Sequence, residues 1–286
     1  MTASCFRRSS RKSVKASREN VNSGTMTDAV SMEAGRPTAS EVSVDSYEVR
    51  ALLVVLSVIA GCTDVISFLG LGGLFTAHIT GNLVILAVHF FSGESQIAPM
   101  LSVPVFIVIL ILIRLLASSL ESRGWASLHP LLLLQFVLLA GFLILCVAAG
   151  SRIDPSGTIE IVAGMVGVSA MAVQSALVQI SLKGAPSTGA MTGNVTFFAT
   201  NVGEILVGHD SAEIAEARKR AVRTLPAVLG FAVGCALGAA SETAMGLRSL
   251  ALPAGLALLA FAMGFAAEPI GDAESKRISR GCEIQS

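Results

Sequence analysis

Charged residues are scarce in this chain of 286 residues: Asp, Glu, Lys and Arg together make up 14% of it, against roughly 25% in soluble domains. Apolar residues account for 53%, and the mean hydropathy is +0.72. A soluble protein of this size needs more charge to cover its surface. The shortage therefore excludes an ordinary soluble domain and predicts membrane spans joined by hydrated connections.

Other residue types and motifs are also scarce or missing, and these shortages limit the classes of function that the chain can have. The formal net charge is zero and there is one Trp and one Tyr, so the chain offers neither excess positive charge nor an aromatic stacking platform for nucleic acid. No Walker loop, HExxH or GxSxG motif occurs, and these are the marks of common enzyme sites. The cysteines form no CxxC pair or Cys/His cluster with metal-ligand spacing; they are Cys5, Cys62, Cys146, Cys235 and Cys282. We expect no enzyme, no cofactor, no metal and no nucleic-acid partner.

Long apolar runs begin at Ala51. A spanning helix needs about 17–25 mainly apolar residues, and helices are expected because they satisfy their own backbone hydrogen bonds in lipid. The junction Phe68–Gly73 is too apolar to be a clear loop, so a broken or re-entrant segment there would reduce the number of spans to seven or six. Eight stretches qualify: 51–70, 72–92, 101–120, 129–149, 159–182, 189–208, 224–241 and 249–267. The prediction is an all-α membrane protein with about eight transmembrane helices.

Lys and Arg set the expected orientation, because cytoplasmic loops carry an excess of them. With eight spans, the basic N-terminal tail, the cluster Arg218–Arg223 and the basic C-terminal tail share one side. The other side receives only Arg123, Lys183 and Arg248. We therefore expect both termini in the cytoplasm and a location in the cell inner (plasma) membrane.

Residues 1–49 are polar and begin with a basic, Ser-rich stretch. We interpret them as a disordered cytoplasmic tail. An organellar transit peptide, or an over-long gene model whose true start is Met26 or Met32, remains the alternative. Residues 269–286 are expected to form a second cytoplasmic tail.

An internal repeat links the two halves of the chain. The tripeptide Thr80-Gly81-Asn82 recurs as Thr192-Gly193-Asn194, and each follows a polar residue in an apolar stretch, Asp64 sixteen positions before the first copy and Gln174 eighteen before the second. Pro104 and Pro226 each open the next span. We predict two repeats of four helices, 50–149 and 150–268. Repeats with an even number of spans insert the same way round, and such symmetry is common in transporters; duplication for stable packing alone is the alternative.

The motifs around the first tripeptide carry a resemblance. The run GCTDVISFLG from Gly61 to Gly70, then GLFTA over Gly73–Ala77 and ITGN over Ile79–Asn82, resembles the signature of the YoaK-like family of bacterial multi-pass inner-membrane proteins. The resemblance covers essentially residues 50–267; the long tails depart from the compact family pattern. It implies an inner-membrane protein of unassigned biochemical function.

Asp64 is the strongest candidate functional residue, because a carboxylate inside a span costs about 2.5–3.5 kcal/mol and is by default a functional hypothesis. Arg114 is expected at a similar depth in the third span. Their counterparts in the second half, Gln174 and Ala236, are both uncharged, as an ion pair predicts, because removing one partner alone is costly. We hypothesise an Asp64–Arg114 ion pair; two independent charges facing a watery cavity are the alternative.

The two tripeptides are the second candidate. They either line a pseudo-symmetric polar pocket or tie helices together by hydrogen bonds. For His78 and His89, packing is the expected role and proton relay is the alternative. Secondary candidates near the ends of the spans are Asn201, Glu204 and Glu242.

The leading hypothesis is a secondary transporter-like carrier of a small solute or ion. Its rival is a non-transport membrane protein, either a scaffold or an intramembrane enzyme of unrecognised type. The sequence predicts the lipid bilayer as a partner but neither the substrate, the coupling ion nor the oligomeric state. In the leading hypothesis, the substrate-binding residues are Asp64, Thr80, Gly81, Asn82, Arg114, Gln174, Thr192, Gly193 and Asn194.

Overall fold

The computed structural model describes residues 47–92, 97–123, 125–150 and 157–265, and within these ranges all regular secondary structure is helical. Most of the expected tail 1–49 and all of the expected tail 269–286 lie outside the described residues. Residues 47–49 form the first turn of a helix instead of the end of a tail.

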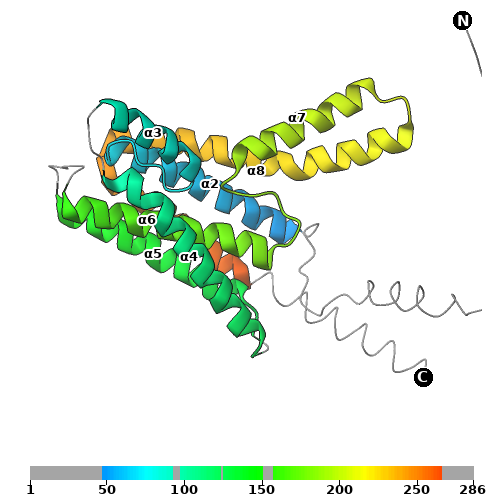
Figure 1. Ribbon diagram of the computed structural model, residues 1–286. Helices are drawn as coiled ribbons and strands as arrows, with labels where there is room; N and C mark the ends of the chain where they lie inside the picture. Colours follow the sequence, from blue (N-terminus) through cyan, green and yellow to red (C-terminus); the bar gives the residue numbers. More distant parts are fainter. Residues whose placement is uncertain (1–46, 93–96, 124, 151–156, 266–286) are drawn as a thin grey trace, which may run out of the picture. The chain divides into compact units, whose positions relative to one another are not determined.

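Two series of helices follow one another along the chain (Figure 1). The first series consists of α2 (Tyr47–Gly70), α3 (Ile79–Ser92), α4 (Ile97–Glu121) and α5 (Leu128–Ala149). The second consists of α6 (Thr158–Ser181), α7 (Met191–Val207) and α8 (Ser211–Met245), after which the 3₁₀ turn η1 (Gly246–Leu250) leads into a last helix over residues 251–265.

Five helical stretches are long and apolar enough to cross a membrane, which supports an integral membrane protein. They are Tyr47–Gly70, Ile97–Glu121, Leu128–Ala149, Thr158–Ser181 and the stretch Ser211–Phe265, in which α8, η1 and the last helix follow one another. The exposed apolar face of α4, which includes Val108 and Leu112, suits contact with lipid.

Two of the eight expected spans are shorter than predicted. The stretch 72–92 forms a helix of only 14 residues, and 189–208 one of 17 residues. At 1.5 Å per residue these measure about 21 Å and about 26 Å, less than the roughly 30 Å of a bilayer's hydrocarbon core. Most of the remaining length is irregular backbone that precedes α3 and α7.

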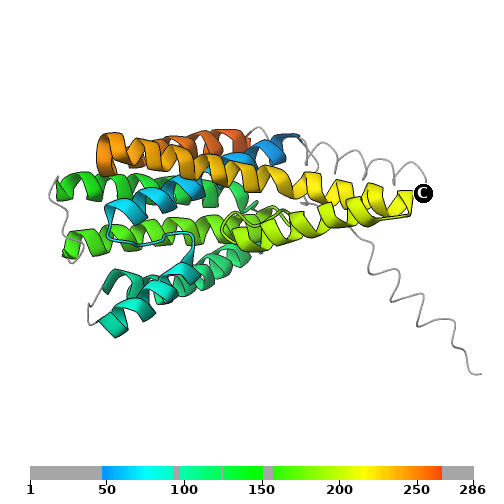
Figure 2. The ribbon, with the colours of Figure 1, turned by 90° about the horizontal axis from the view of Figure 1, so that it is seen from above.

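The long helices pack reciprocally between the two series. Helix α2, which comes before α3, packs against α8, whereas α6, which comes before α7, packs against α4 and α5. Each short helix packs on the long helix that follows it, α3 on α4 and α7 on α8; Figures 1 and 2 show the α7–α8 pair side by side. The first helix of each series thus contacts the third helix of the other.

Small residues bring α2 and α8 close together. Gly230, Gly234 and Gly238 recur every four residues on α8, and a Cβ atom at Gly238 would lie 2.9 Å from the carbonyl oxygen of Cys62. At Gly234 the added Cβ would overlap the carbonyl oxygen of Val58. Such glycines let two helix backbones approach within a membrane, so this interface has no room for a side chain.

Candidate functional site

Each short helix is preceded by a non-helical segment of the chain, which we call a break. The first break, Leu71–His78, follows α2 and includes Gly72 and Gly73 with positive φ values of 69° and 92°. The second break, Leu182–Ala190, follows α6 and includes Gly184 with φ of 80°. Glycine adopts these left-handed conformations without a steric penalty, so the sequence locally permits both helices to end.

Asp64 holds the first break in place. This buried side chain extends from α2, and its Oδ1 atom accepts hydrogen bonds from the backbone N–H groups of Thr76 at 2.8 Å and Ala77 at 2.6 Å. His78 Nδ1 lies 2.5 Å from Oδ2. The carboxylate therefore sits at the N-terminus of α3, where free N–H groups and the helix dipole favour negative charge. These contacts explain how α2 tolerates a buried carboxylate.

The expected Asp64–Arg114 ion pair is replaced by this arrangement. Arg114 lies exposed on α4, and among the described helices α4 packs on α3 and α6 but not on α2. The prediction was wrong because distance along each helix gives the depth of a residue but not the direction in which it points. Asp64 meets the neighbouring break and His78 instead.

In the second half, Gln174 on α6 hydrogen-bonds to the second break, as Asp64 on α2 does to the first. Its buried amide nitrogen donates hydrogen bonds to the hydroxyl of Thr188, in the second break, and to the carbonyl oxygen of Leu56 on α2, both at 2.9 Å. Its amide oxygen accepts a hydrogen bond from Gln135 on α5 at 2.7 Å. One side chain thus connects α6 with the second break, α2 and α5.

The asparagines of the two tripeptides fasten the breaks to the short helices. Asn82 accepts a hydrogen bond from Phe75 N–H at 2.9 Å and donates to Phe75 C=O at 2.7 Å. Asn194 donates to Ser187 C=O at 2.5 Å, so both asparagines bind the residue seven positions earlier. Asn82 alone of the two also reaches the next helix, through a bond of 2.8 Å to Ser102 on α4.

The two breaks meet. A Cβ atom at Gly189 in the second break would lie 3.7 Å from the carbonyl oxygen of Ala77 in the first. The side chains of Asp64 and Asn82 gather at the first break and those of Gln174 and Asn194 at the second, in buried contacts with protein. These four candidate residues therefore form two adjacent polar clusters, an arrangement that agrees with the second of the two expected roles, hydrogen bonds that tie helices together.

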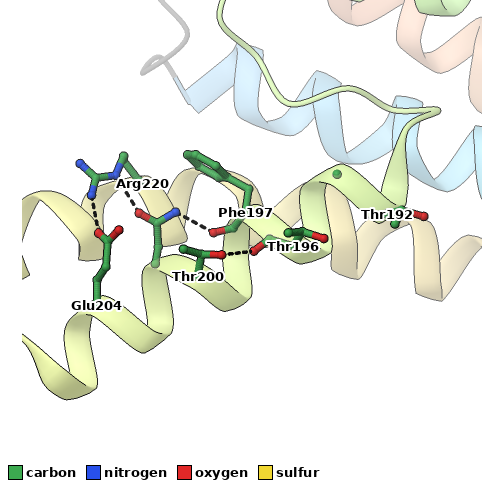
Figure 3. Close-up of a pocket in the computed structure, with 8 residues that line it drawn as sticks. Thr192, Thr196, Phe197, Thr200, Glu204 and Arg220 are labelled. Carbon is green, nitrogen blue, oxygen red and sulfur yellow. Dashed lines mark hydrogen bonds and ion pairs between the residues drawn. The ribbon is translucent and has the colours of Figure 1, made fainter.

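The remaining tripeptide residues lie differently in the two halves. Thr80 is exposed on α3, and Gly81 leaves room for the ring of Phe75, whose nearest atom would be 2.8 Å from an added Cβ. Thr192 and Gly193, in contrast, line a hollow of about 540 Å³ along α7 (Figure 3).

The hollow along α7, which we call the α7 groove, ends at an ion pair. Arg220 on α8 donates from Nε to Asn201 Oδ1 and from Nη2 to Glu204 Oε2, both at 2.7 Å. Sequence reasoning placed Asn201 and Glu204 among secondary candidates but missed Arg220, because a pair separated by 16 residues in sequence leaves no local signal. The four-residue spacing of the threonines was a signal that could have found the groove. The lining residues are Thr192, Gly193, Thr196, Phe197, Thr200, Asn201, Glu204 and Arg220.

Comparison with known proteins places most of the chain in one family. A family model described as "Protein of unknown function (DUF1275)" matches residues 52–263, which include every described helix except the ends of the first and last. No curated protein and no solved structure matches the chain.

Proposed function

We propose that this chain, which belongs to the DUF1275 family of proteins of unknown function, is a secondary transporter-like carrier of a small solute. The observation that carries the proposal is the meeting of two helix breaks, each held by a buried polar side chain from the preceding helix. Paired, interrupted membrane helices in corresponding positions of two halves mark the substrate sites of many carriers.

The carrier is built from two four-helix repeats with eight spans. Both series of helices begin in the same order: a helix of 24 residues, a break, a short helix and a longer helix on which the short one packs. Corresponding contacts support the repeat, since Thr76 and Thr188 each lie six residues before the tripeptide asparagine. The Thr76 hydroxyl donates to Asp64, and the Thr188 hydroxyl accepts from Gln174. Such parallel repeats are related by an axis along the membrane normal.

Orientation and location belong to the same proposal. The excess of Lys and Arg at both ends of the sequence and at Arg218–Arg223 supports cytoplasmic termini in the plasma membrane. The resemblance to YoaK-like inner-membrane proteins agrees with this placement and stays a prediction.

Transport requires the two breaks to separate. In the present conformation the polar side chains at each break hydrogen-bond to protein groups, and the two breaks approach closely at Ala77 and Gly189. A solute that enters there must replace protein hydrogen bonds with its own, each worth about 0.5–1.5 kcal/mol, or about 1.5–3 kcal/mol where the carboxylate takes part. Asp64 and Gln174 are the groups that such a solute would meet.

A structural membrane protein is the second candidate, and one observation favours it. The side chains of Asp64, Asn82, Gln174 and Asn194 all hydrogen-bond to protein, as expected of groups that only shape the helix breaks. The two candidates differ in whether the breaks move.

Uptake into proteoliposomes separates these candidates. Purified protein would be tested against a labelled panel of amino acids, sugars, carboxylates and amines, with Asp64→Asn as the variant and Glu121→Gln, an exposed carboxylate at the end of α4, as the matched control. A carrier takes up at least one solute at a rate that Asp64→Asn changes and Glu121→Gln does not. Uptake that is identical in all three proteins, or absent for every solute, would leave the structural role.

A further inference from the structure

The α7 groove begins beside a charged segment and extends toward the second break. Its outer end is formed by Glu204 and by Arg220, which belongs to the charged first part of α8. Thr192, at its other end, lies in the first turn of α7, directly after the second break. Glu204 lies twelve positions after Thr192, which corresponds to about 18 Å of helix. Polar side chains therefore recur along the groove between its charged end and the second break, namely those of Asn201, Thr200 and Thr196.

The short helix of the first half provides an internal comparison. Counted from the tripeptides, Thr196 on α7 corresponds to Val84 on α3, and Thr200 corresponds to Val88. All four side chains are exposed. The first half presents valine, which suits lipid, whereas the second presents hydroxyl groups at the same positions. This difference favours contact with water on the α7 face, although the Thr200 hydroxyl also donates to the carbonyl oxygen of Thr196 at 2.9 Å.

We propose that the α7 groove is filled with water and binds small polar solutes that carry no net charge. The inference deepens the proposed function and rests on it for its biological role, because the groove would bring solute to the second break. The existence of the groove does not depend on the proposed function, because its lining residues define it.

The charges of the groove indicate the class of solute. Arg220 and Glu204 neutralise one another across 2.7 Å, so an ion of either sign gains little from the pair as a whole. Yet the fold places a guanidinium with five N–H donors beside a carboxylate with two acceptor oxygens, and the contacts to Asn201 and Glu204 use two of those donors and one of those oxygens. A zwitterion or a polyol supplies both donors and acceptors.

Thiol labelling tests whether the groove is hydrated. Single cysteines would be introduced at Thr196, Thr200, Val84 and Val88 in a chain whose five natural cysteines are replaced, and each would be treated in membranes with a charged, membrane-impermeant methanethiosulfonate. We expect Thr196→Cys and Thr200→Cys to react faster than their matched valine positions by on the order of tenfold or more, because only a hydrated thiol ionises readily to the reactive thiolate.

Equal, slow labelling at all four positions would overturn the inference. So would a disulfide between two copies through Thr196→Cys accompanied by protection of that thiol, because the groove would then be an interface with a second copy of the chain.

Protection experiments test the class of solute. Glycine and glycerol should slow the labelling of Thr196→Cys, whereas acetate and methylammonium should not. Adding Arg220→Gln should remove the protection. Adding Arg223→Gln is the matched control and should keep it, because the guanidinium of Arg223 donates to Gly184 C=O. The assignment would be contradicted if only the ions protected the thiol or if none of the four compounds did. It would also be contradicted if protection persisted unchanged in Arg220→Gln.

These measurements need no transport activity, so they separate the two proposals. A hydrated, protected groove in a protein that takes up no solute would sustain the binding site and end the carrier. Uptake by a protein with a dry groove would do the reverse.

Discussion

Removal of the Asp64 carboxylate should destabilise the first break more than any conservative change there. In Asp64→Ala the N–H groups of Thr76 and Ala77 lose an acceptor at 2.8 and 2.6 Å in a buried site. An unsatisfied buried donor costs about 1–3 kcal/mol, so the two together cost about 2–6 kcal/mol. This is a large part of the roughly 5–15 kcal/mol that stabilises a typical folded protein.

Asp64→Asn provides the graded comparison. Its carboxamide retains an acceptor oxygen for the two N–H groups but loses the charge. Because bonds to a charged group contribute about 1.5–3 kcal/mol and neutral ones about 0.5–1.5 kcal/mol, we expect a loss of about 1–3 kcal/mol. The order of stability should be wild type, then Asp64→Asn, then Asp64→Ala.

Thermal unfolding in detergent measures this order. A thiol-reactive fluorophore reports unfolding through the free cysteines Cys62, Cys146 and Cys235, once Cys5 and Cys282 are replaced by serine. Glu121→Ala, at an exposed carboxylate, should stay within about 0.5 kcal/mol of wild type. Wild-type stability of Asp64→Ala would refute the view that this carboxylate holds the break.

Three further changes test the packing and the groove. Gly234→Ala should cost about 1–3 kcal/mol by overpacking against α2, whereas Gly255→Ala, which meets no atom within 4 Å, should not destabilise; equal melting temperatures would contradict the close α2–α8 contact. Asn82→Ala should destabilise more than Asn194→Ala in the same unfolding assay, since only Asn82 bonds both to its break and to α4; the reverse order would count against this role. Glu204→Gln should change stability by no more than about 1 kcal/mol, because the side chain is 52% exposed, and a larger loss would show that the ion pair supports the fold.

Much of the architecture was accessible from the sequence, because apolar length and glycine content are local properties. Each of the eight expected stretches overlaps a helix. The lengths of α3 and α7 were not predicted, since a stretch such as Gly72–His78 is apolar enough to be counted as part of a span. It stays irregular because Asp64 and Asn82 bind its backbone, and these contacts depend on tertiary structure.

The sequence identified several residues of the candidate site, but it did not identify their hydrogen-bond partners. Asp64, Gln174 and the two asparagines are buried and contact the helix breaks. Their partners could not be read from spacing. Arg220 joins Asn201 only because α7 and α8 pack as a hairpin, and the direction of Arg114 depends on which helices surround α4.

The central claim is that the two helix breaks meet at Ala77 and Gly189 and separate during transport. The most direct measurement is solute uptake by proteoliposomes that contain Ala77→Cys and Gly189→Cys in a chain without its natural cysteines, before and after bridging with a short, reducible bifunctional thiol reagent. We expect the bridge to form, to stop uptake, and to release it on reduction, with each single cysteine unaffected. Undiminished uptake by the bridged protein would contradict the claim.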